Sequence, residues 1–479
     1  MTVAVALGLG SFLVGLRVFR SPEALPPQQS GTTSTTLAAS SRAAPTTTAP
    51  ELPNADPTEA EVDQRGLPSA LRPLTAGCDD PVVVAPPAAD LETVVATADP
   101  GTCFMLEAGE YRFHNVEPKD FMTFLGASRD STIVVGSASA ENAFHGTATG
   151  VTIGRLTLTG FQGDGGEKRQ EQGAIRGTSA LWASDRGEMA RDWLIEDIEA
   201  SDNFATGVFL GDNFTIRGST FSRNGVSGLG GSETVGGLIE ANIVDNNGAQ
   251  AATGVLGNGG GMKFTQAASI DDPLVVRDNE IFGNSGIGVW CDIGCDGFEV
   301  IDNYIHDQES RAVMFELSSN AVIRGNLLVN TNQWSDFSRD FNAAAIAVGE
   351  SSDVLIEDNY IDGAVAGIIV RQTQRPVRPQ ESFLDEYEGV TYLSQRVSIR
   401  NNVILNAEAM GISTGSTGRG LMPDLASIRF EGNVYDDPGR IVFWWANGDR
   451  YSFNDWQASG RDLGGGVNIP ARPVWPIDS

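Results

Sequence analysis

The sequence predicts an all-β protein in which short parallel strands wind into a solenoid. A motif of an apolar residue, two residues, Asn, one residue and a second apolar residue recurs along the chain, and its closest copies lie 23 or 24 residues apart. Runs of alternating residues accompany the copies, and glycine, at 56 of 479 residues, separates these runs. No amphipathic helical pattern intervenes, which excludes a sheet whose strands are joined by helices. A short unit repeated in this way stacks on its neighbours and buries a continuous core.

The recurring asparagines form the first element of this prediction. They are Asn242, Asn279, Asn303, Asn326, Asn359, Asn402 and Asn433, and Ser219 keeps the spacing before them. Longer gaps between some copies indicate the same unit with insertions. Asparagine suits turns, where its side chain bonds to local backbone and tolerates a left-handed conformation. Stacked asparagines also bond to one another as a ladder, so we interpret them as architecture and not as chemistry.

The second element is a set of five-residue strands. They are Gly207–Gly211, Gly261–Thr265, Gly288–Asp292, Ala312–Glu316, Ala345–Gly349, Gly367–Arg371 and Gly411–Gly415. Their second and fourth positions are mostly apolar, so these side chains should point into the core. The third and fifth positions should then point outward. Insertions at 248–260, 331–344, 372–394 and 416–427 flank these strands and would form the walls of a groove.

An outward strip of six residues is the candidate site. It consists of Lys263, Trp290, Asp292, Met314, Glu316 and Arg371. An exposed Trp290 would offer a platform on which a sugar ring stacks, with Met314 and Arg371 as further substrate-binding residues. The alternative is that Trp290 and Met314 only pack beneath the insertions.

Asp292 and Glu316 occupy equivalent positions on adjacent coils, so their Cα atoms should lie about 4.8 Å apart. Two carboxyl groups at such a separation suit glycoside hydrolysis. Lyase or epimerase chemistry on a uronic acid is a second interpretation, with Lys263 or Arg371 taking part as the base or the neutralising group. The carboxylate pair would then be a candidate Ca²⁺ site, although the sequence indicates no firm cofactor and leaves any metal ligands unknown. The alternative for the whole group is a set of surface ion pairs.

Charge limits the partners. The net charge is −30, which disfavours nucleic acid and also disfavours a polyanionic substrate unless a cation bridges the two. Only three of the 32 basic residues are lysines (Lys119, Lys168 and Lys263). We expect a monomer.

The N-terminal region predicts export. Residues 1–20 form a hydrophobic signal or anchor segment, and residues 21–75 form a linker rich in Pro, Thr, Ser and Ala. Only the first of these would meet a membrane. Four cysteines fall into two local pairs, Cys78 with Cys103 and Cys291 with Cys295, as expected for disulfides in an oxidising compartment. We therefore expect an extracytoplasmic protein, secreted or anchored.

Three stretches of the chain resemble a known superfamily. They are Pro100–Tyr111 with Glu117–Lys119, Gly260–Lys263 continuing through Trp290–Asp292 to Glu316, and Asn433–Tyr435 with Tyr451–Gln457. Together they resemble the right-handed parallel β-helix proteins of the pectate-lyase-like superfamily, most closely bacterial repeat proteins of mostly unassigned activity. The resemblance covers about residues 76–460.

The resemblance implies a right-handed parallel β-helix at 151–435, preceded by a cap and entry coils at 76–150 and followed by a C-terminal cap at 436–479. It also implies a polysaccharide partner, with a hydrolase or lyase activity. The alternative is a non-catalytic, glycan-binding or adhesive solenoid. Exposed Asp292 and Glu316 side chains would favour the enzyme, and a buried strip would favour the non-catalytic protein.

Overall fold

The computed structural model describes residues 78–88, 90–162, 173–179, 188–249, 259–267, 269–332, 343–373, 393–414, 422–446 and 449–474. The predicted segments 1–20 and 21–75 lie outside these ranges, as does half or more of each predicted insertion. No helix within the described ranges is long and apolar enough to cross a membrane.

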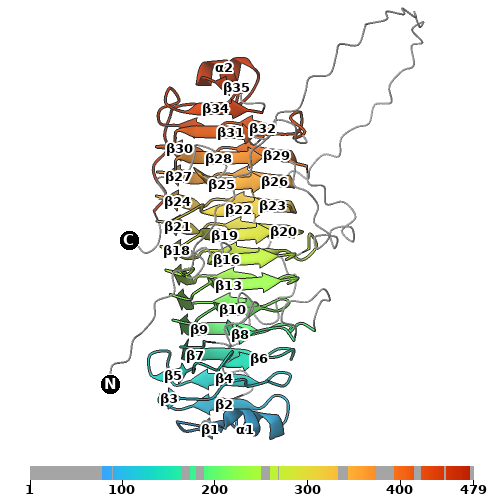
Figure 1. Ribbon diagram of the computed structural model, residues 1–479, viewed down its shortest axis with the longest axis vertical. Helices are drawn as coiled ribbons and strands as arrows, with labels where there is room; N and C mark the ends of the chain where they lie inside the picture. The colour runs from blue at the N-terminus through green and yellow to red at the C-terminus, as the bar shows by residue number, and fades with distance from the viewer. Residues whose placement is uncertain are drawn as a thin grey trace, which may run out of the picture. The chain divides into compact units, whose positions relative to one another are not determined.

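A sheet of twelve described strands runs through the stack of coils (Figure 1). In spatial order its strands are β6 (Phe144–His145), β8 (Gly173–Arg176), β10 (Thr206–Leu210), β13 (Ser227–Ser232), β16 (Gly260–Thr265), β19 (Ile287–Asp292), β22 (Val313–Glu316), β25 (Ala344–Gly349), β28 (Ala366–Arg371), β31 (Ala409–Ser413), β34 (Val442–Trp445) and β35 (Asp449–Tyr451). All its pairs are parallel except the last, β34 with β35.

The second sheet has 23 described strands in two parallel rows. The first row is β1 (Val82–Val84), β2 (Cys103–Leu106), β4 (Thr123–Gly126), β7 (Thr152–Thr159), β9 (Leu194–Ser201), β11 (Thr215–Arg217), β14 (Leu238–Glu240), β17 (Leu274–Arg277), β20 (Asp296–Ile301), β23 (Ser319–Arg324), β26 (Ser352–Glu357), β29 (Gln395–Arg400) and β32 (Arg429–Glu431). The second row is β3 (Gly109–Tyr111), β5 (Thr132–Val135), the long strands β7 and β9 again, β12 (Thr220–Ser222), β15 (Ile243–Asp245), β18 (Glu280–Phe282), β21 (Tyr304–His306), β24 (Leu327–Val329), β27 (Tyr360–Asp362), β30 (Val403–Leu405) and β33 (Val434–Tyr435).

Each central coil therefore contributes three strands, for example β19, β20 and β21.

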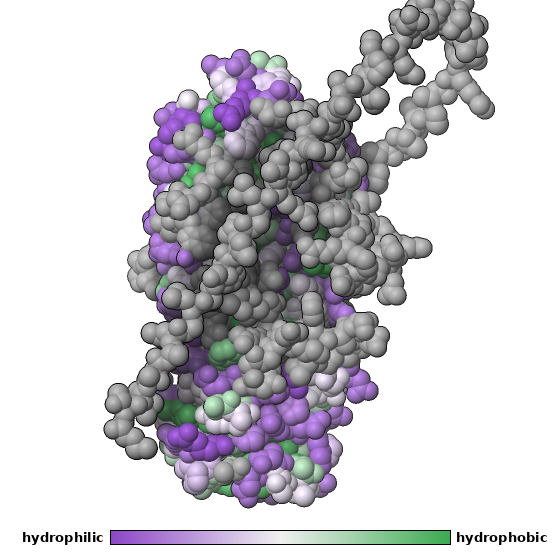
Figure 2. Space-filling model, viewed as in Figure 1, coloured by the Kyte–Doolittle hydropathy of each residue, from purple (hydrophilic) through white to green (hydrophobic). Residues whose placement is uncertain are grey.

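The described surface at both ends of the stack is largely hydrophilic on the side seen in Figure 2, in keeping with the charge of −30. Two short helices of the described part of the chain lie at these ends (Figure 1). Helix α1 (Leu91–Thr97) buries Leu91 and Val95 beside the first strands, and α2 (Phe453–Ala458) buries Trp456 against Phe443, with ring centroids 5.3 Å apart.

The predicted asparagine ladder is confirmed. In each step one Oδ1 accepts hydrogen bonds from both the backbone N–H and the side-chain amide of the preceding asparagine; between Asn303 and Asn326 both distances are 3.0 Å. One detail of the prediction is wrong, because the left-handed conformation belongs to the residue before the asparagine. Asp302, for example, has φ 53°. Asn303, the ladder residue that follows, turns its side-chain amide inward, where the amide also donates to the carbonyl of Val276.

Asp462 ends this ladder in the C-terminal region. Its Oδ1 accepts from the backbone N–H of Asn433 at 3.0 Å, and its Oδ2 accepts from the Tyr435 hydroxyl at 2.7 Å. The residue is completely buried. Burial raises the pKa of the Asp462 carboxyl above its usual value, although the hydrogen bonds from Asn433 and Tyr435 act in the opposite direction.

Replacing Asp462 with asparagine should raise the melting temperature near neutral pH. The folded-state pKa lies above the unfolded-state value, so ionisation costs stability as the pH rises, and this cost vanishes below the unfolded-state pKa. The asparagine keeps an acceptor for Asn433, and its amide can donate to the Tyr435 hydroxyl. The hydroxyl hydrogen can then turn to Met410 Sδ, which lies 3.2 Å from the Tyr435 oxygen. Thermal unfolding at neutral and strongly acidic pH checks this. A variant that melts lower than the wild type at neutral pH would contradict it.

Candidate functional site

The register of the twelve-stranded sheet brings the outward strip together. Lys263 on β16 pairs with Trp290 on β19, which pairs with Met314 on β22. Asp292 and Glu316 are direct register partners on β19 and β22, which confirms the predicted adjacency. Arg371 on β28 lies two strands beyond Glu316 in the same column.

The strip lies on the face of the sheet that points away from the core. Val289 and Cys291, which alternate with Trp290 along β19, belong to the main core. Trp290 and Met314 belong instead to a separate apolar cluster. Its other buried members are Ile287, Ala343, Ala344, Ala347, Ala366, Ile369 and Ala409.

The expectation of an exposed Trp290 platform is wrong. Trp290 is 8% exposed and Met314 is 5% exposed. The physical reason is that the same columns continue into small and aliphatic residues such as Ala347 and Ile369, which pack together as a second apolar cluster. The predicted groove walls at 248–260, 331–344, 372–394 and 416–427 fall mostly outside the described residues.

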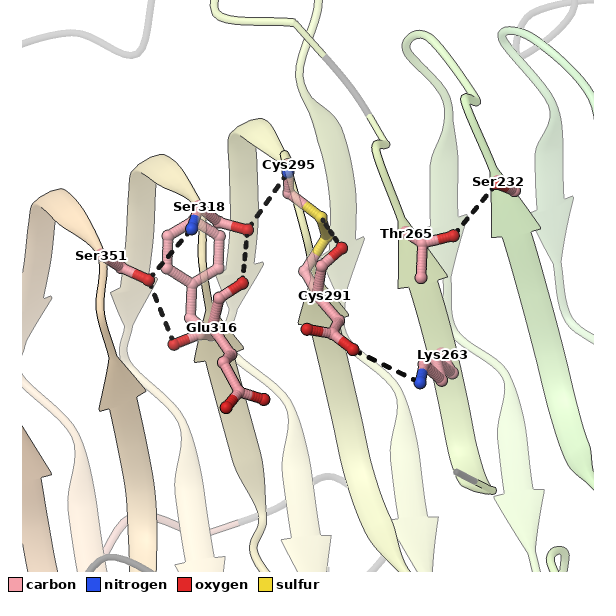
Figure 3. Close-up of a disulfide and its surroundings, with 10 residues drawn as sticks. Ser232, Lys263, Thr265, Cys291, Cys295, Glu316, Ser318 and Ser351 are labelled. Carbon is pink, nitrogen blue, oxygen red and sulfur yellow. Dashed lines mark hydrogen bonds and ion pairs between the residues drawn. A yellow bond between two sulfur atoms is a disulfide. The ribbon is translucent and has the colours of Figure 1, made fainter. Parts of the chain in front are cut away.

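Lys263 connects Trp290 to Asp292. Its Nζ lies 3.4 Å from Asp292 Oδ2 and 3.6 Å from the centroid of the Trp290 ring. The Lys263 side chain retains only 12% exposure and that of Asp292 9%. The predicted ion-pair alternative is therefore realised between these two residues, but it is a shielded pair and not a pair on the open surface. Figure 3 shows Lys263 and Glu316 on either side of the strand that carries Cys291.

Arg371 holds two carboxylates. Its Nη2 lies 2.6 Å from Glu316 Oε1 and 2.9 Å from Glu350 Oε2. Gly349 stands between Glu316 and Arg371 in the column, and because it has no side chain the guanidinium can reach across one coil. Burial alone would lower the pKa of Arg371, but Glu350 and Glu316 together raise it above the usual arginine value.

Glu350 is the residue of this network that the sequence pattern missed. It is completely buried, and its Oε1 accepts from the backbone N–H of Thr373 at 2.7 Å and from the Thr373 hydroxyl at 2.6 Å. Glu350 follows β25 directly and has a left-handed backbone with φ 47°, as do Leu317 and Ile293 after β22 and β19. This shared turn position, one residue beyond the five-residue strands, is the signal that could have found it.

The turns after Asp292 and Glu316 are fixed by a disulfide and by serines (Figure 3). Cys291 and Cys295 are joined across the turn that follows Asp292. The Cys295 N–H donates to Ser318 Oγ at 3.1 Å, and the Ser318 N–H donates to Ser351 Oγ at 3.2 Å. These contacts couple successive coils just beyond the carboxylates. The second disulfide joins Cys78 to Cys103, at the start of β2, far from the strip in sequence.

The Ca²⁺ candidate does not fit the arrangement found. Among the described residues no group of three or more His, Cys, Asp or Glu side chains is arranged to hold a metal ion. Asp292 and Glu316 instead face Lys263 and Arg371, whose positive charges would repel a cation. The carboxylate pair is therefore not assigned as a Ca²⁺ site.

The strip thus holds carboxylates and cations that are paired with one another, shielded from solvent and placed beside the Trp290 indole. Removing such charges from water is costly even when they are paired. Stacking of the coils does not require these charges, since the column of Lys263 continues into Ala347 and Ile369. The column of Asp292 and Glu316 likewise contains the uncharged Thr265 and Gly349.

Comparisons with known proteins agree on the fold. A family model described as "Right handed beta helix region" matches residues 186–338. No curated protein matches the chain. The A-module of the mannuronan C-5 epimerase AlgE6 from Azotobacter vinelandii superposes with a TM-score of 0.50 at 15% identity, covering 81% of this chain and 94% of that chain.

A second solved structure is the catalytic domain of a GH87 α-1,3-glucanase in complex with tetrasaccharides. It has a TM-score of 0.55 at 15% identity and covers 81% of this chain and 68% of that chain. The same domain in complex with nigerose has a TM-score of 0.50 at 14% identity, with the same coverage. At such low identities the likeness concerns the fold. The chain is thus a right-handed parallel β-helix protein, as the matched family region, the parallel sheets and these neighbours show.

Proposed function

We propose that this protein acts on polysaccharide at the outward strip, with Asp292 and Glu316 as the reacting carboxyl groups. The observation that carries the proposal is their direct pairing on adjacent strands, outside the core, in a shielded setting with cations on both sides. Hydrolysis of a glycosidic bond needs two carboxyl groups that flank the bond, and neighbouring strands about 4.8 Å apart can supply them. The epimerase and glucanase neighbours support polysaccharide as the substrate class.

In this proposal the other residues of the strip position and bind. Lys263 orients Asp292, and Arg371 orients Glu316 through contacts of 3.4 and 2.6 Å. Trp290 and Met314 supply an apolar wall for a sugar ring. The strip also allows a lyase reaction, that is, elimination from a uronic acid, as a subclass of the proposed activity. Lys263 could serve as its base, because a lysine, unlike an arginine, can give up its proton.

Burial favours a second candidate, a non-catalytic glycan-binding protein. Asp292 and Glu316 are 6% and 5% exposed. A substrate would have to displace the contacts that shield them, whereas a structural role for the charges would not require any such displacement.

Assays over a panel of polysaccharides test the proposal. Purified protein is incubated with neutral and uronic polysaccharides, with and without Ca²⁺, and both new reducing ends and the ultraviolet absorbance of unsaturated uronates are recorded. We expect new reducing ends. Absorbance together with reducing ends would indicate elimination. Binding without any cleavage would establish the non-catalytic candidate. The absence of both binding and cleavage would overturn the proposal.

We also propose that the protein works outside the cytoplasm. The support is its two disulfides, which persist in oxidising compartments. Thiol labelling of protein extracted from its native cells should find all four cysteines blocked, and four free thiols would contradict this location.

A further inference from the structure

The Trp290 indole carries a donor for which the described part of the chain supplies no acceptor. Its Nε1 is buried and has no hydrogen-bond partner within the described ranges, and the residue as a whole is only 8% exposed. The ring is fixed beside the paired charges, since Lys263 Nζ lies 3.6 Å from its centroid and 3.4 Å from Asp292 Oδ2. A buried N–H without a partner costs free energy, and a ligand oxygen placed against it removes that cost. The indole therefore marks a position for an oxygen atom of the ligand.

The two cations of the strip are already engaged by carboxylates. Lys263 faces Asp292, and Arg371 faces both Glu316 and Glu350. Among the described residues, these contacts thus set two cations against three carboxylates, so this part of the strip offers no excess of positive charge.

A polyuronate would bring one further negative charge with every sugar to this cluster. Its carboxylates would have to displace Asp292, Glu316 or Glu350 from their cations, against the field of a chain whose net charge is −30. A sugar hydroxyl both donates and accepts hydrogen bonds, so it can donate to these carboxylates and accept from Lys263, Arg371 or the indole without adding a charge to the cluster.

We infer that the ligand of the outward strip is a neutral polysaccharide, one of whose oxygens accepts a hydrogen bond from Trp290 Nε1. The inference rests on the proposed function and narrows its substrate class. It excludes polyuronates as the preferred ligand, and with them the elimination subclass.

A matched pair of polymers tests the charge preference. Polygalacturonate and its carboxyl-reduced form share one linkage and differ in charge, and an α-1,3-glucan, a β-1,3-glucan, alginate and xylan widen the panel. Binding and new reducing ends are measured at low and high NaCl. We expect neutral polymers to be preferred, with an affinity that changes less than about twofold with salt, because screening acts on charged ligands. Preference for a uronic polymer would overturn the inference and leave the proposed function standing. Inactivity towards every polymer would defeat both.

Trp290→Phe tests the assignment to the strip. The variant keeps an aromatic ring and loses the N–H, so the affinity for the best neutral oligosaccharide should fall about three- to tenfold, as for one lost hydrogen bond. The control is Trp444→Phe, a partly buried indole on β34 outside the cluster, which should leave the affinity unchanged. Melting temperatures of both variants show whether they fold. An unchanged affinity in a folded Trp290→Phe variant, or an equal loss in the control, would overturn the assignment.

Discussion

Asp292→Asn and Glu316→Gln should each lower the rate of polysaccharide cleavage by about 10² to 10⁴, the usual contribution of a general acid or base. Both replacements keep the shape of the side chain and remove its ability to exchange a proton. Because Glu316 is bound by Arg371 and Asp292 by Lys263, both variants also weaken an ion pair. The cleavage rate is therefore measured beside the melting temperature, and only the rate should collapse.

Glu357→Gln is the matched control for these two variants. Glu357 is a shielded carboxylate on β26, and it accepts from Arg324 Nε and from Arg400 Nε at 2.6 Å each. The replacement thus weakens comparable ion pairs in the other sheet. Cleavage at the wild-type rate is expected. Activity in both Asp292→Asn and Glu316→Gln, or an equal loss in Glu357→Gln, would show that the carboxylate pair performs no chemistry.

Asn326→Ala should lower the free energy of unfolding by about 3 to 5 kcal/mol, because several buried groups lose their partners at once. Asn326 Oδ1 accepts two hydrogen bonds from Asn303, and its amide donates to the carbonyl of Val300 and to Asn359 Oδ1 at 2.9 Å each. Alanine removes the Asn326 acceptor of the buried Asn303 backbone N–H and one acceptor of the Asn303 amide, which keeps the Val276 carbonyl. It also takes the side-chain donor from the Val300 carbonyl.

Denaturant unfolding measures this loss. The control is Asn454→Ala at an exposed position of α2, which should change the free energy by less than about 0.5 kcal/mol. If the two replacements cost the same, the ladder does not hold the coils together.

Repetition made the winding of the chain predictable. Once the period was fixed by residues such as Asn303 and Asn326, equivalent positions on neighbouring coils had to pair, and the pairing of Asp292 with Glu316 followed. A second buried ladder, formed by Asn203, Asn224, Asn247 and Asn284, was missed. Its members stand five residues after Ser219 and its equivalents, a fixed offset that the sequence also contains.

The surroundings of the strip were less predictable than its register. Alternation along a strand tells which face a side chain takes, but it does not tell what packs upon that face, and so Trp290 was expected in solvent. The reach of Arg371 to Glu316 depends on the bare backbone of Gly349 between them. Glu350 escaped notice because its turn lies beyond the strand pattern.

The most direct test is a crystal structure of the Glu316→Gln variant soaked with the neutral oligosaccharide that binds best. The sugar should lie along the outward strip, with an oxygen within hydrogen-bond distance of Trp290 Nε1 and other oxygens contacting Asp292. A sugar bound elsewhere, such as on the cap beside Trp444, would contradict the proposed site, above all if the contacts of Lys263 with Asp292 and of Arg371 with residue 316 were undisturbed.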